Sequence, residues 1–451
     1  MGTALLWFRR DLRLADLPAL LSASERATRV LALYVLDEAL LKPAGRPRQA
    51  FLYGCLESLA ESLDGRLMVV HGDPVREVPR VARSIGAGSV HVSTDTGPYG
   101  RRRDRAVAEA LGEIEWVECG SSYAVTPGRI TKPDGEPYRV FSAFYRAWCR
   151  HGWRAPAARS EVDWLEPEEP FRLPGIPDLG SMSLPRPGEA AAREAWERFL
   201  DGGLDGYATD RDRPDRPATT RLSPYLRWGC IHPRTLLAGL DAVRGKDAES
   251  LRSELAWREF YADVLYHRPE TARRNYDSRF DELEYDTDLD AFERWRTGRT
   301  GYPIVDAGMR QLLAEGWMHN RVRMIVASFL VKDLHQPWWL GARHFMNSLV
   351  DGDLASNQLN WQWVAGTGTD PAPFFRVFNP TTQGEKFDPN GDYVRRYVPE
   401  LREIPGKAVH QPWKLPHPPK NYPSPMVDHA EERKVALTRF NAINQSAQRS
   451  L

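Results

Sequence analysis

An acid, a large aromatic ring and a cation share one face of a predicted helix. Glu254, Trp257 and Arg258 lie at positions i, i+3 and i+4, a spacing that brings side chains to the same side of a helix. Together they could hydrogen-bond to a planar ligand and stack on it. Taken alone, a core tryptophan beside a surface ion pair explains the three residues more simply.

Three hydroxyl side chains precede another predicted helix. Thr219, Thr220 and Ser223 flank Arg221 and Leu222. Hydroxyls and backbone N–H groups at the start of a helix suit a phosphate. For this segment alone, an ordinary N-cap by threonine or serine is the favoured interpretation.

A third segment contains two carboxylates, Asp351 and Asp353, and the side-chain amide of Asn357. The aspartates could hold a metal ion, but no histidine or glutamate lies at a suitable spacing, so no metal site is predicted. Helix capping accounts for them. His319 is also expected to be structural, because no other candidate ligand joins it.

Short apolar runs alternate with amphipathic segments in the first third of the chain. Runs that are apolar throughout are typical of parallel strands buried on both faces. Strands are predicted over residues 4–8, 30–36, 67–71, 89–93 and 114–119. Helices are predicted between them, over residues 17–27, 48–63, 74–85 and 101–111. This order predicts a doubly wound α/β domain with a parallel sheet.

The rest of the chain differs in composition. Prolines and acidic residues become frequent over 127–189, which indicates a long connector, and helical periodicity dominates from residue 190. We therefore expect an α/β domain over 1–126, the connector over 127–189 and an all-α domain over 190–451. The first strand is not followed by a glycine-rich dinucleotide fingerprint, and the chain has no phosphate loop of the Walker type.

Composition excludes several classes of protein. The 451 residues contain no apolar run long enough to cross a membrane, and the four scattered cysteines do not suggest a disulfide scaffold. We expect a cytoplasmic protein. The 61 basic and 61 acidic residues cancel, which excludes a uniformly basic nucleic-acid binder but not a local basic face. The 15 tryptophans supply rings that could stack on planar ligands.

Several motifs in a fixed order resemble the photolyase/cryptochrome family over nearly the whole chain. They are Trp-Phe-Arg-Arg-Asp-Leu-Arg-Leu at 7–14, Leu-Ser-Pro-Tyr-Leu at 222–226, and the segments 254–260, 301–307, 316–324, 351–363, 369–380 and 384–389. The resemblance is strongest to class I photolyases of cyclobutane pyrimidine dimers. It implies an α/β antenna domain and a helical domain that binds FAD.

The resemblance also assigns flavin contacts. Near the phosphates and the ribitol it implies Tyr207, Thr219, Thr220, Leu222 and Ser223. Around the ring systems it implies Arg258, Trp317, Arg323, Asp351 and Asp353, with Arg323 paired to Asp351. Such an ion pair would stabilise the anionic charge of reduced FAD. Asn357 would accept a hydrogen bond from flavin N5, whereas plant cryptochromes place Asp there.

Members of the family that split cyclobutane dimers resemble this chain at Glu254, Trp257, Asn320, Met324 and Trp363. A dimer flipped out of the duplex would stack on the two tryptophans, and a protonated Glu254 would donate to a pyrimidine carbonyl. Light-excited reduced FAD would pass an electron to the dimer, the ring would open, and the electron would return. The (6-4) photolyases instead carry a pair of histidines where this chain has Asn320 and Met324.

A second group of aromatics matches the family's route for reducing oxidised flavin with light. The matching positions are Trp361, Trp338 and Tyr285, so the outermost position is tyrosine rather than the usual tryptophan. Trp339 adjoins Trp338 and is explained equally well by packing.

Segment 96–104 looks more like that of members that bind a deazaflavin antenna than that of folate-binding members. The expected antenna is 8-hydroxy-5-deazaflavin, with methenyltetrahydrofolate less favoured. The alternative for the arginines of 101–105 is a solvated start of a helix.

The expected partner is UV-damaged DNA, and the chain is expected to be a monomer with no obligate protein partner. Candidate phosphate contacts are Arg321, Arg376, Arg395 and Arg396. A sensory cryptochrome without repair activity and a (6-4) photolyase are the alternative functions. Asn357 and the intact set of pocket residues favour dimer repair.

Overall fold

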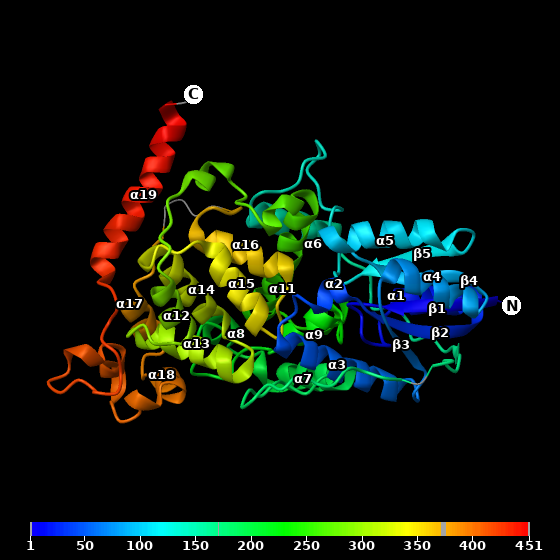
Figure 1. Cartoon of the computed structure of the whole chain (residues 1–451), viewed down its shortest axis with the longest axis horizontal. Coiled ribbons are helices and arrows are strands. Elements are labelled where there is room, and N and C mark those ends of the chain that lie inside the picture. The colour runs from blue at the N-terminus through cyan, green and yellow to red at the C-terminus, as the bar shows by residue number, and fades with distance from the viewer. Residues whose placement is uncertain (1, 170, 371–375, 450–451) are drawn as a thin grey trace. The chain divides into compact units, whose positions relative to one another are not determined.

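The computed structural model describes residues 2–169, 171–370 and 376–449 (Figure 1). Part of the motif at 369–380 therefore lies outside the described residues. The chain forms two compact units. The sheet unit comprises Met1–Asp178, Pro185–Asp205 and Thr220–Pro269, and the helical unit comprises Leu179–Leu184, Gly206–Thr219 and Glu270–Leu451.

The sheet unit contains one parallel sheet in the order β3-β2-β1-β4-β5, with the short β6 beside β2. Its strands are β1 (Gly2–Phe8), β2 (Ala27–Leu36), β3 (Leu67–His71), β4 (Ala87–Thr94), β5 (Glu115–Ser121) and β6 (Asp163–Trp164). In the register of the sheet, Leu5 of β1 lies between Leu31 of β2 and Val90 of β4. The predicted parallel α/β fold is confirmed.

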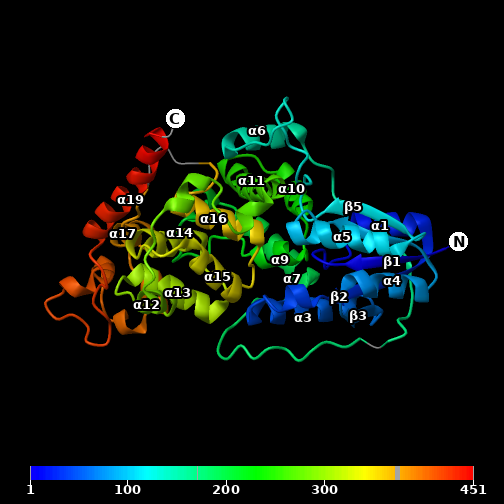
Figure 2. The same cartoon turned by 45° about the horizontal axis from the view of Figure 1, so that its top comes forward.

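Helices cover both faces of this sheet. The connecting helices are α1 (Pro18–Arg26), α2 (Glu38–Leu41), α3 (Arg46–Ser62), α4 (Pro74–Ser84) and α5 (Pro98–Leu111). Figures 1 and 2 show α3 and α5 on opposite sides of the strands. Leu5 and Trp7 face the core that Val78 of α4 and Val107 of α5 complete. Burial on both faces explains why these strands are apolar throughout.

The remaining helices of the sheet unit come from later in the chain. They are α6 (Phe141–His151), α7 (Glu189–Arg198), η1 (Phe199–Gly203), α9 (Ser223–Trp228), α10 (Pro233–Asp241) and α11 (Lys246–His267). Helix α6 lies inside the predicted connector and packs on α11.

The compact units do not follow the boundaries expected at residues 126 and 189. Buried polar contacts tie the later helices to the sheet. Arg234 of α10 donates to Asp16 at 2.6 Å, and Glu259 of α11 accepts from the backbone N–H of Val125 at 3.0 Å. Because these groups are buried, separating them would leave charges without partners.

The helical unit is built around one apolar core. Its elements include α8 (Tyr207–Asp210), α12 (Leu289–Arg296), α13 (Pro303–Glu315), α14 (Asn320–Ser328), η4 (Phe329–Asp333), α15 (Trp338–Ser348), α16 (Leu354–Ala365), α17 (Pro380–Phe387), α18 (Asp392–Tyr397) and α19 (His429–Arg449). Large side chains such as Trp295, Phe329, Trp338 and Trp361 fill this core. Within the described part of the chain, no helix is long and apolar enough to span a membrane.

Candidate active site

Helix α11 in the sheet unit carries the predicted face of Glu254, Trp257 and Arg258, and all three residues are partly exposed. Phe141 of α6 lies parallel to Trp257, with ring centroids 3.7 Å apart and planes 9° apart. One side of the indole is therefore held in place by another ring. A fixed and partly exposed indole is suited to stacking on a base or another planar group.

Arg258 joins α11 to two other segments of the sheet unit. Its guanidinium donates to the carbonyl of Ser122 at 2.9 Å and to that of Leu226 at 3.1 Å. The group also lies over the ring of Tyr123, 4.5 Å from its centroid. These contacts fix the side chain beside α9, the helix that Ser223 begins.

The segment before α9 has an unusual backbone. Arg221 has φ of 53°, in the left-handed region, and the hydroxyl of Thr220 accepts from the N–H of Leu222 at 3.3 Å. Holding a non-glycine residue there costs on the order of 1–2 kcal/mol. Strain of this kind is concentrated at ligand sites, so it agrees with the binding role predicted for Thr220, Leu222 and Ser223.

In the helical unit, Arg323 and Asp351 form the predicted ion pair, at 2.8 Å. Arg323 also donates to the carbonyl of Met318 at 2.8 Å and lies 5.9 Å from the ring centroid of Trp317. The second carboxylate oxygen of Asp351, Oδ1, is buried and has no hydrogen-bond partner among the described residues. A buried acceptor without a donor is costly, so this oxygen fits a donor group of a bound flavin.

Asn357 of α16 is held by both hydrogens of its amide. Nδ2 donates to the carbonyl of Ala342 at 3.0 Å and to Oε1 of Gln358 at 2.8 Å. With both donors used, the amide oxygen is the group left to accept from a ligand. Sequence reasoning selected Asn357 but not Gln358, for which the sequence contains no separate signal.

The other predicted flavin residues of the helical unit are Tyr207, Thr219 and Asp353. Tyr207 is buried at the start of α8, with Arg211 5.9 Å from its ring centroid. Asp353 accepts from the N–H of Ser356 at 3.1 Å and so caps α16, as predicted for this residue. Asp351 is an ion-pair residue instead of a cap.

Helix α14 carries the predicted substrate residues Asn320, Arg321 and Met324. Asn320 is exposed, whereas Arg321 and Met324 are partly buried. Arg321 is paired with Asp212 at 2.8 Å and lies 4.6 Å from the ring centroid of Phe387. The predicted partner Trp363, on α16, is partly exposed.

His319 has the structural role predicted for it. Its Nδ1 accepts from the N–H of Arg321 at 3.2 Å and caps α14. Among the residues described, no group of three or more His, Cys, Asp and Glu side chains could hold a metal ion.

The aromatic residues predicted for flavin reduction lie on α15 and α16, with Tyr285 in the segment before α12. Trp338 and Trp361 are buried, and the indole N–H of Trp338 donates to Asn275 at 2.9 Å. Tyr285 is in ring contact with Trp339 at 5.1 Å, and Trp339 with Trp338 at 5.9 Å.

A charged cluster lies in the sheet unit where β1 and β4 end, the point at which the strand order reverses. Ligands of doubly wound sheets bind at this position. Arg9 donates to both oxygens of Asp104, at 2.7 and 2.8 Å, and Arg103 pairs with Asp104 and with Asp95. Both guanidinium groups also lie near the ring of Trp7, 4.8 and 5.0 Å from its centroid.

Two further residues lie near this cluster: Asp37, directly after β2, and Tyr99, at the start of α5. The hydroxyl of Tyr99 donates to Asp37 at 2.5 Å. Burial and this hydrogen bond raise the pKa of Tyr99 well above its usual value. The indole N–H groups of Trp7 and Trp228 are buried without an acceptor among the described residues. Of the basic residues in 101–105, only Arg103 is buried, and Arg101 donates to the carbonyl of Tyr266 at 3.2 Å.

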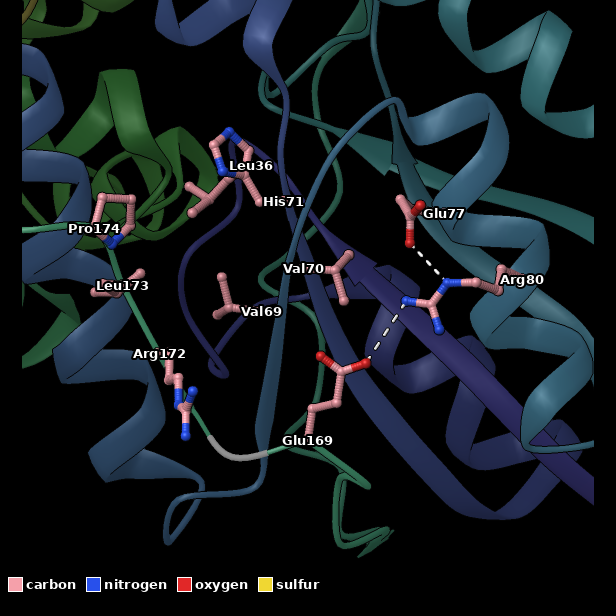
Figure 3. Close-up of a pocket in the computed structure, with 10 residues that line it drawn as sticks. All are labelled: Leu36, Val69, Val70, His71, Glu77, Arg80, Glu169, Arg172, Leu173 and Pro174. Atoms are coloured by element: carbon pink, nitrogen blue, oxygen red, sulfur yellow. Dashed lines mark hydrogen bonds and ion pairs between the residues drawn. The ribbon is translucent and has the colours of Figure 1, made fainter.

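Figure 3 shows a separate pocket of about 370 Å³ beside β3, where Leu173 and Pro174 of the long connector approach the strand. Three of its polar side chains form ion pairs: Arg80 contacts Glu77 at 2.8 Å and Glu169 at 3.9 Å. No predicted site residue lines it.

Comparisons with known proteins agree with this architecture. The family model described as DNA photolyase matches residues 4–162, and that described as the FAD binding domain of DNA photolyase matches residues 250–442. The chain belongs to the DNA photolyase family. It therefore contains the predicted FAD-binding domain, and the family assignment made from the sequence motifs is confirmed.

Relatives over nearly the full length support a photo-lyase enzyme. A deoxyribodipyrimidine photo-lyase of Agrobacterium fabrum is 39% identical over 98% of each chain, and one of Streptomyces griseus is 42% identical over 96% of this chain and 98% of that protein. A class III photolyase from Agrobacterium tumefaciens superposes with a TM-score of 0.91, at 37% identity over 99% of this chain and 98% of the other. A Synechocystis cryptochrome gives 0.89, at 29% identity over 97% and 98%.

Proposed function

We propose that the chain repairs cyclobutane pyrimidine dimers in DNA, using light and reduced FAD. The arrangement of Asn357 carries this proposal. Because Ala342 and Gln358 take both amide hydrogens, the amide presents a neutral acceptor oxygen. Such a group can accept from N5–H of reduced flavin without placing a second negative charge beside it.

The remaining predicted flavin residues are proposed to bind FAD in two groups. Tyr207, Thr219, Thr220, Leu222 and Ser223 would contact the phosphates and the ribitol, and Arg258, Trp317, Arg323, Asp351 and Asp353 the ring systems. The pairing of Arg323 with Asp351 supports this assignment, because the pair leaves one buried oxygen to accept from the cofactor. FAD supplies the electron for the reaction, and the protein side chains position it and exclude water.

The lesion is proposed to contact Glu254, Trp257, Asn320, Arg321, Met324 and Trp363. The parallel packing of Phe141 on Trp257 supports stacking, since it holds the indole ready before a base arrives. Glu254 would donate to a pyrimidine carbonyl. Asn320 and Met324 stand in place of the histidine pair that the resemblance associates with (6-4) repair.

Two further proposals concern the supply of light and electrons. Trp361 and Trp338 would return oxidised flavin to the reduced state. Their outermost donor would be either Tyr285, the position that the resemblance implies, or Trp339, which is in ring contact with both Trp338 and Tyr285. The cluster at the ends of β1 and β4 would bind 8-hydroxy-5-deazaflavin. The buried indole N–H group of Trp7 supports this choice, because a deazaflavin offers carbonyl acceptors.

The deciding experiment exposes oligothymidine carrying cyclobutane dimers to the dithionite-reduced, FAD-loaded protein, in blue light and in darkness. Recovery of thymine absorbance only in light is expected. A parallel substrate carrying the (6-4) lesion should show no recovery. Recovery of neither lesion by fully reduced protein would overturn the proposal and favour a sensory cryptochrome.

A further inference from the structure

An exposed tryptophan lies at the outer end of the aromatic residues of the helical unit. Trp338 and Trp361 are buried, whereas 38% of the surface of Trp339 is exposed. The rings of Trp338 and Trp339 are 5.9 Å apart at 80°, and those of Trp339 and Tyr285 are 5.1 Å apart at 75°. There are therefore two candidates for the outermost electron donor, Trp339 and Tyr285.

Trp361 and Trp338 are brought together by the packing of α16 on α15. A Cβ atom added to Gly341, one turn after Trp338, would lie 2.1 Å from the ring of Trp361. The indole of Trp361 therefore rests on the backbone of α15 at Gly341, one turn from Trp338. Figure 1 shows the two helices side by side.

The other ring contacts of Trp361 do not lead to the surface. Its neighbour Trp295, at 6.2 Å, is fully buried and donates its indole N–H to the carbonyl of Val326 at 2.9 Å. Beyond Trp295, the described ring contacts are with two phenylalanines and His344. These rings are harder to oxidise than tryptophan, so this branch ends inside the protein.

Tyr285 lacks a place for its proton. Its hydroxyl is buried and meets no hydrogen-bond acceptor among the described residues. An oxidised phenol is a strong acid, so electron loss from tyrosine requires a proton acceptor within hydrogen-bond reach. An indole can lose an electron first and release its N–H proton to water afterwards, and Trp339 is open to water.

We propose that Trp339 is the terminal electron donor of light-driven flavin reduction in this chain, and that Tyr285 is not. The inference rests on the proposed function. Trp361 gives one electron to light-excited oxidised FAD, Trp338 refills Trp361, and Trp339 refills Trp338. The Trp339 radical cation then gives its N–H proton to water. An external thiol transfers one hydrogen atom to the neutral radical, which restores the indole and leaves a thiyl radical.

The test compares Trp339→Phe with the matched Tyr285→Phe in the full-length, FAD-loaded protein. Both variants keep an aromatic ring, and melting temperatures check their folding. Trp339→Phe should lower the yield of light-driven flavin reduction about tenfold, whereas Tyr285→Phe should leave it nearly unchanged. Transient absorption and electron paramagnetic resonance should show a tryptophanyl radical in the unchanged protein and in Tyr285→Phe.

A tyrosyl radical that disappears in Tyr285→Phe would overturn the proposal, and so would an unchanged yield in Trp339→Phe. Dimer repair by dithionite-reduced protein bypasses this route and should survive in both variants. If reduced unchanged protein repairs no dimers, the proposed function fails, while the identity of the radical still tests the role of Trp339.

Discussion

At the scale of single residues, the candidate site depends on how neighbours use the hydrogen bonds of each functional group. Asn357 presents its oxygen because Ala342 and Gln358 occupy its two amide hydrogens. Asp351 uses one oxygen for Arg323, and its other, buried oxygen has no donor within the described part of the chain. In both cases the protein contacts decide which atom faces a ligand.

Replacing Asn357 by Asp should impair both the protein and its chemistry. The carboxylate would face two oxygens that now accept hydrogen bonds, at a cost of about 1–3 kcal/mol in unfolding free energy. Its charge would also disfavour the anionic reduced flavin. We expect light-driven dimer repair to fall at least about tenfold, measured by thymine absorbance recovery.

Gln358→Ala is the matched control for this substitution, because it removes one acceptor of the same amide without adding charge. It should lose less activity than Asn357→Asp. Equal losses in the two variants would show that orientation of the amide matters and that charge does not.

At the scale of elements, buried contacts join segments that are far apart in the sequence. Glu259 of α11 accepts from the N–H groups of Ala124 and Val125, at 2.5 and 3.0 Å, and from the indole N–H of Trp148 at 2.7 Å. One carboxylate thus holds the segment after β5 and helix α6 against α11. All three groups that contact Glu259 are N–H donors, so each needs an acceptor. A glutamine has only one acceptor atom, its amide oxygen, because its other polar atom is a donor.

Glu259→Gln should therefore lower the unfolding free energy by about 1–3 kcal/mol, because the new amide group faces donors. Denaturant unfolding followed by circular dichroism measures the loss. Glu109→Gln, at an exposed position of α5, is the control and should change stability by no more than about 0.5 kcal/mol.

The difference in unfolding free energy between the parent protein and Glu259→Gln should depend on pH. Burial raises the pKa of Glu259 to about 7, so the folded state holds this proton more tightly than the unfolded chain does. Stability from this group is then present below its ordinary pKa and lost as the pH rises toward 7. The difference in stability between the parent and Glu259→Gln should shrink from pH 5 to pH 8. A growing difference would show that the three N–H donors outweigh burial.

Gly341 is required by the contact between α15 and α16. A methyl group there would meet Trp361 at 2.1 Å and Leu330 at 2.6 Å, inside a filled core. Gly341→Ala should cost about 1–3 kcal/mol by overpacking, measured by thermal unfolding. Gly202→Ala is the control, because nothing lies within 4 Å of its added carbon. A melting temperature of Gly341→Ala equal to that of the control would contradict this account.

At the scale of the whole molecule, DNA must be bound by a chain whose basic and acidic residues cancel. The structure separates the candidate arginines. Arg321 is paired with Asp212, and Arg395 donates to the carbonyls of Asn390 and Ile404. Arg396 is exposed. Of these three it is the candidate whose charge is most available to a phosphate, and the fourth candidate, Arg376, is exposed as well.

Affinity for dimer-containing DNA should fall as salt rises, because bound phosphates release counterions. Arg396→Ala should reduce the slope of log affinity against log salt by about 1, whereas Asp392→Ala, which removes a partner of Arg395, should not reduce it. Fluorescence anisotropy at several salt concentrations provides the measurement. A slope near zero in the parent protein would exclude binding through phosphates.

Much of the fold could be predicted from the sequence, and the reasons are local. Strands such as β1 and β2 are apolar throughout because helices bury both of their faces. Contacts that join distant positions could not be predicted. Nothing near Phe141 indicates that it packs on Trp257, and nothing near Asp212 indicates that it pairs with Arg321. The boundaries expected at 126 and 189 differ from the limits of the compact units, because contacts such as that of Arg234 with Asp16 join distant segments.

The way the sheet unit is assembled affects its synthesis on the ribosome. Asp16 lies 218 residues before its partner Arg234, and Arg13 lies 216 residues before the carbonyl of Gly229 that it contacts. At about 5–20 residues per second, the nascent sheet waits on the order of 10–40 s for these partners. During that interval the emerging chain carries unpaired charges that later lie buried. Slow translation or chaperone binding between the last strand and α11 should therefore decide how much of the protein reaches its native state.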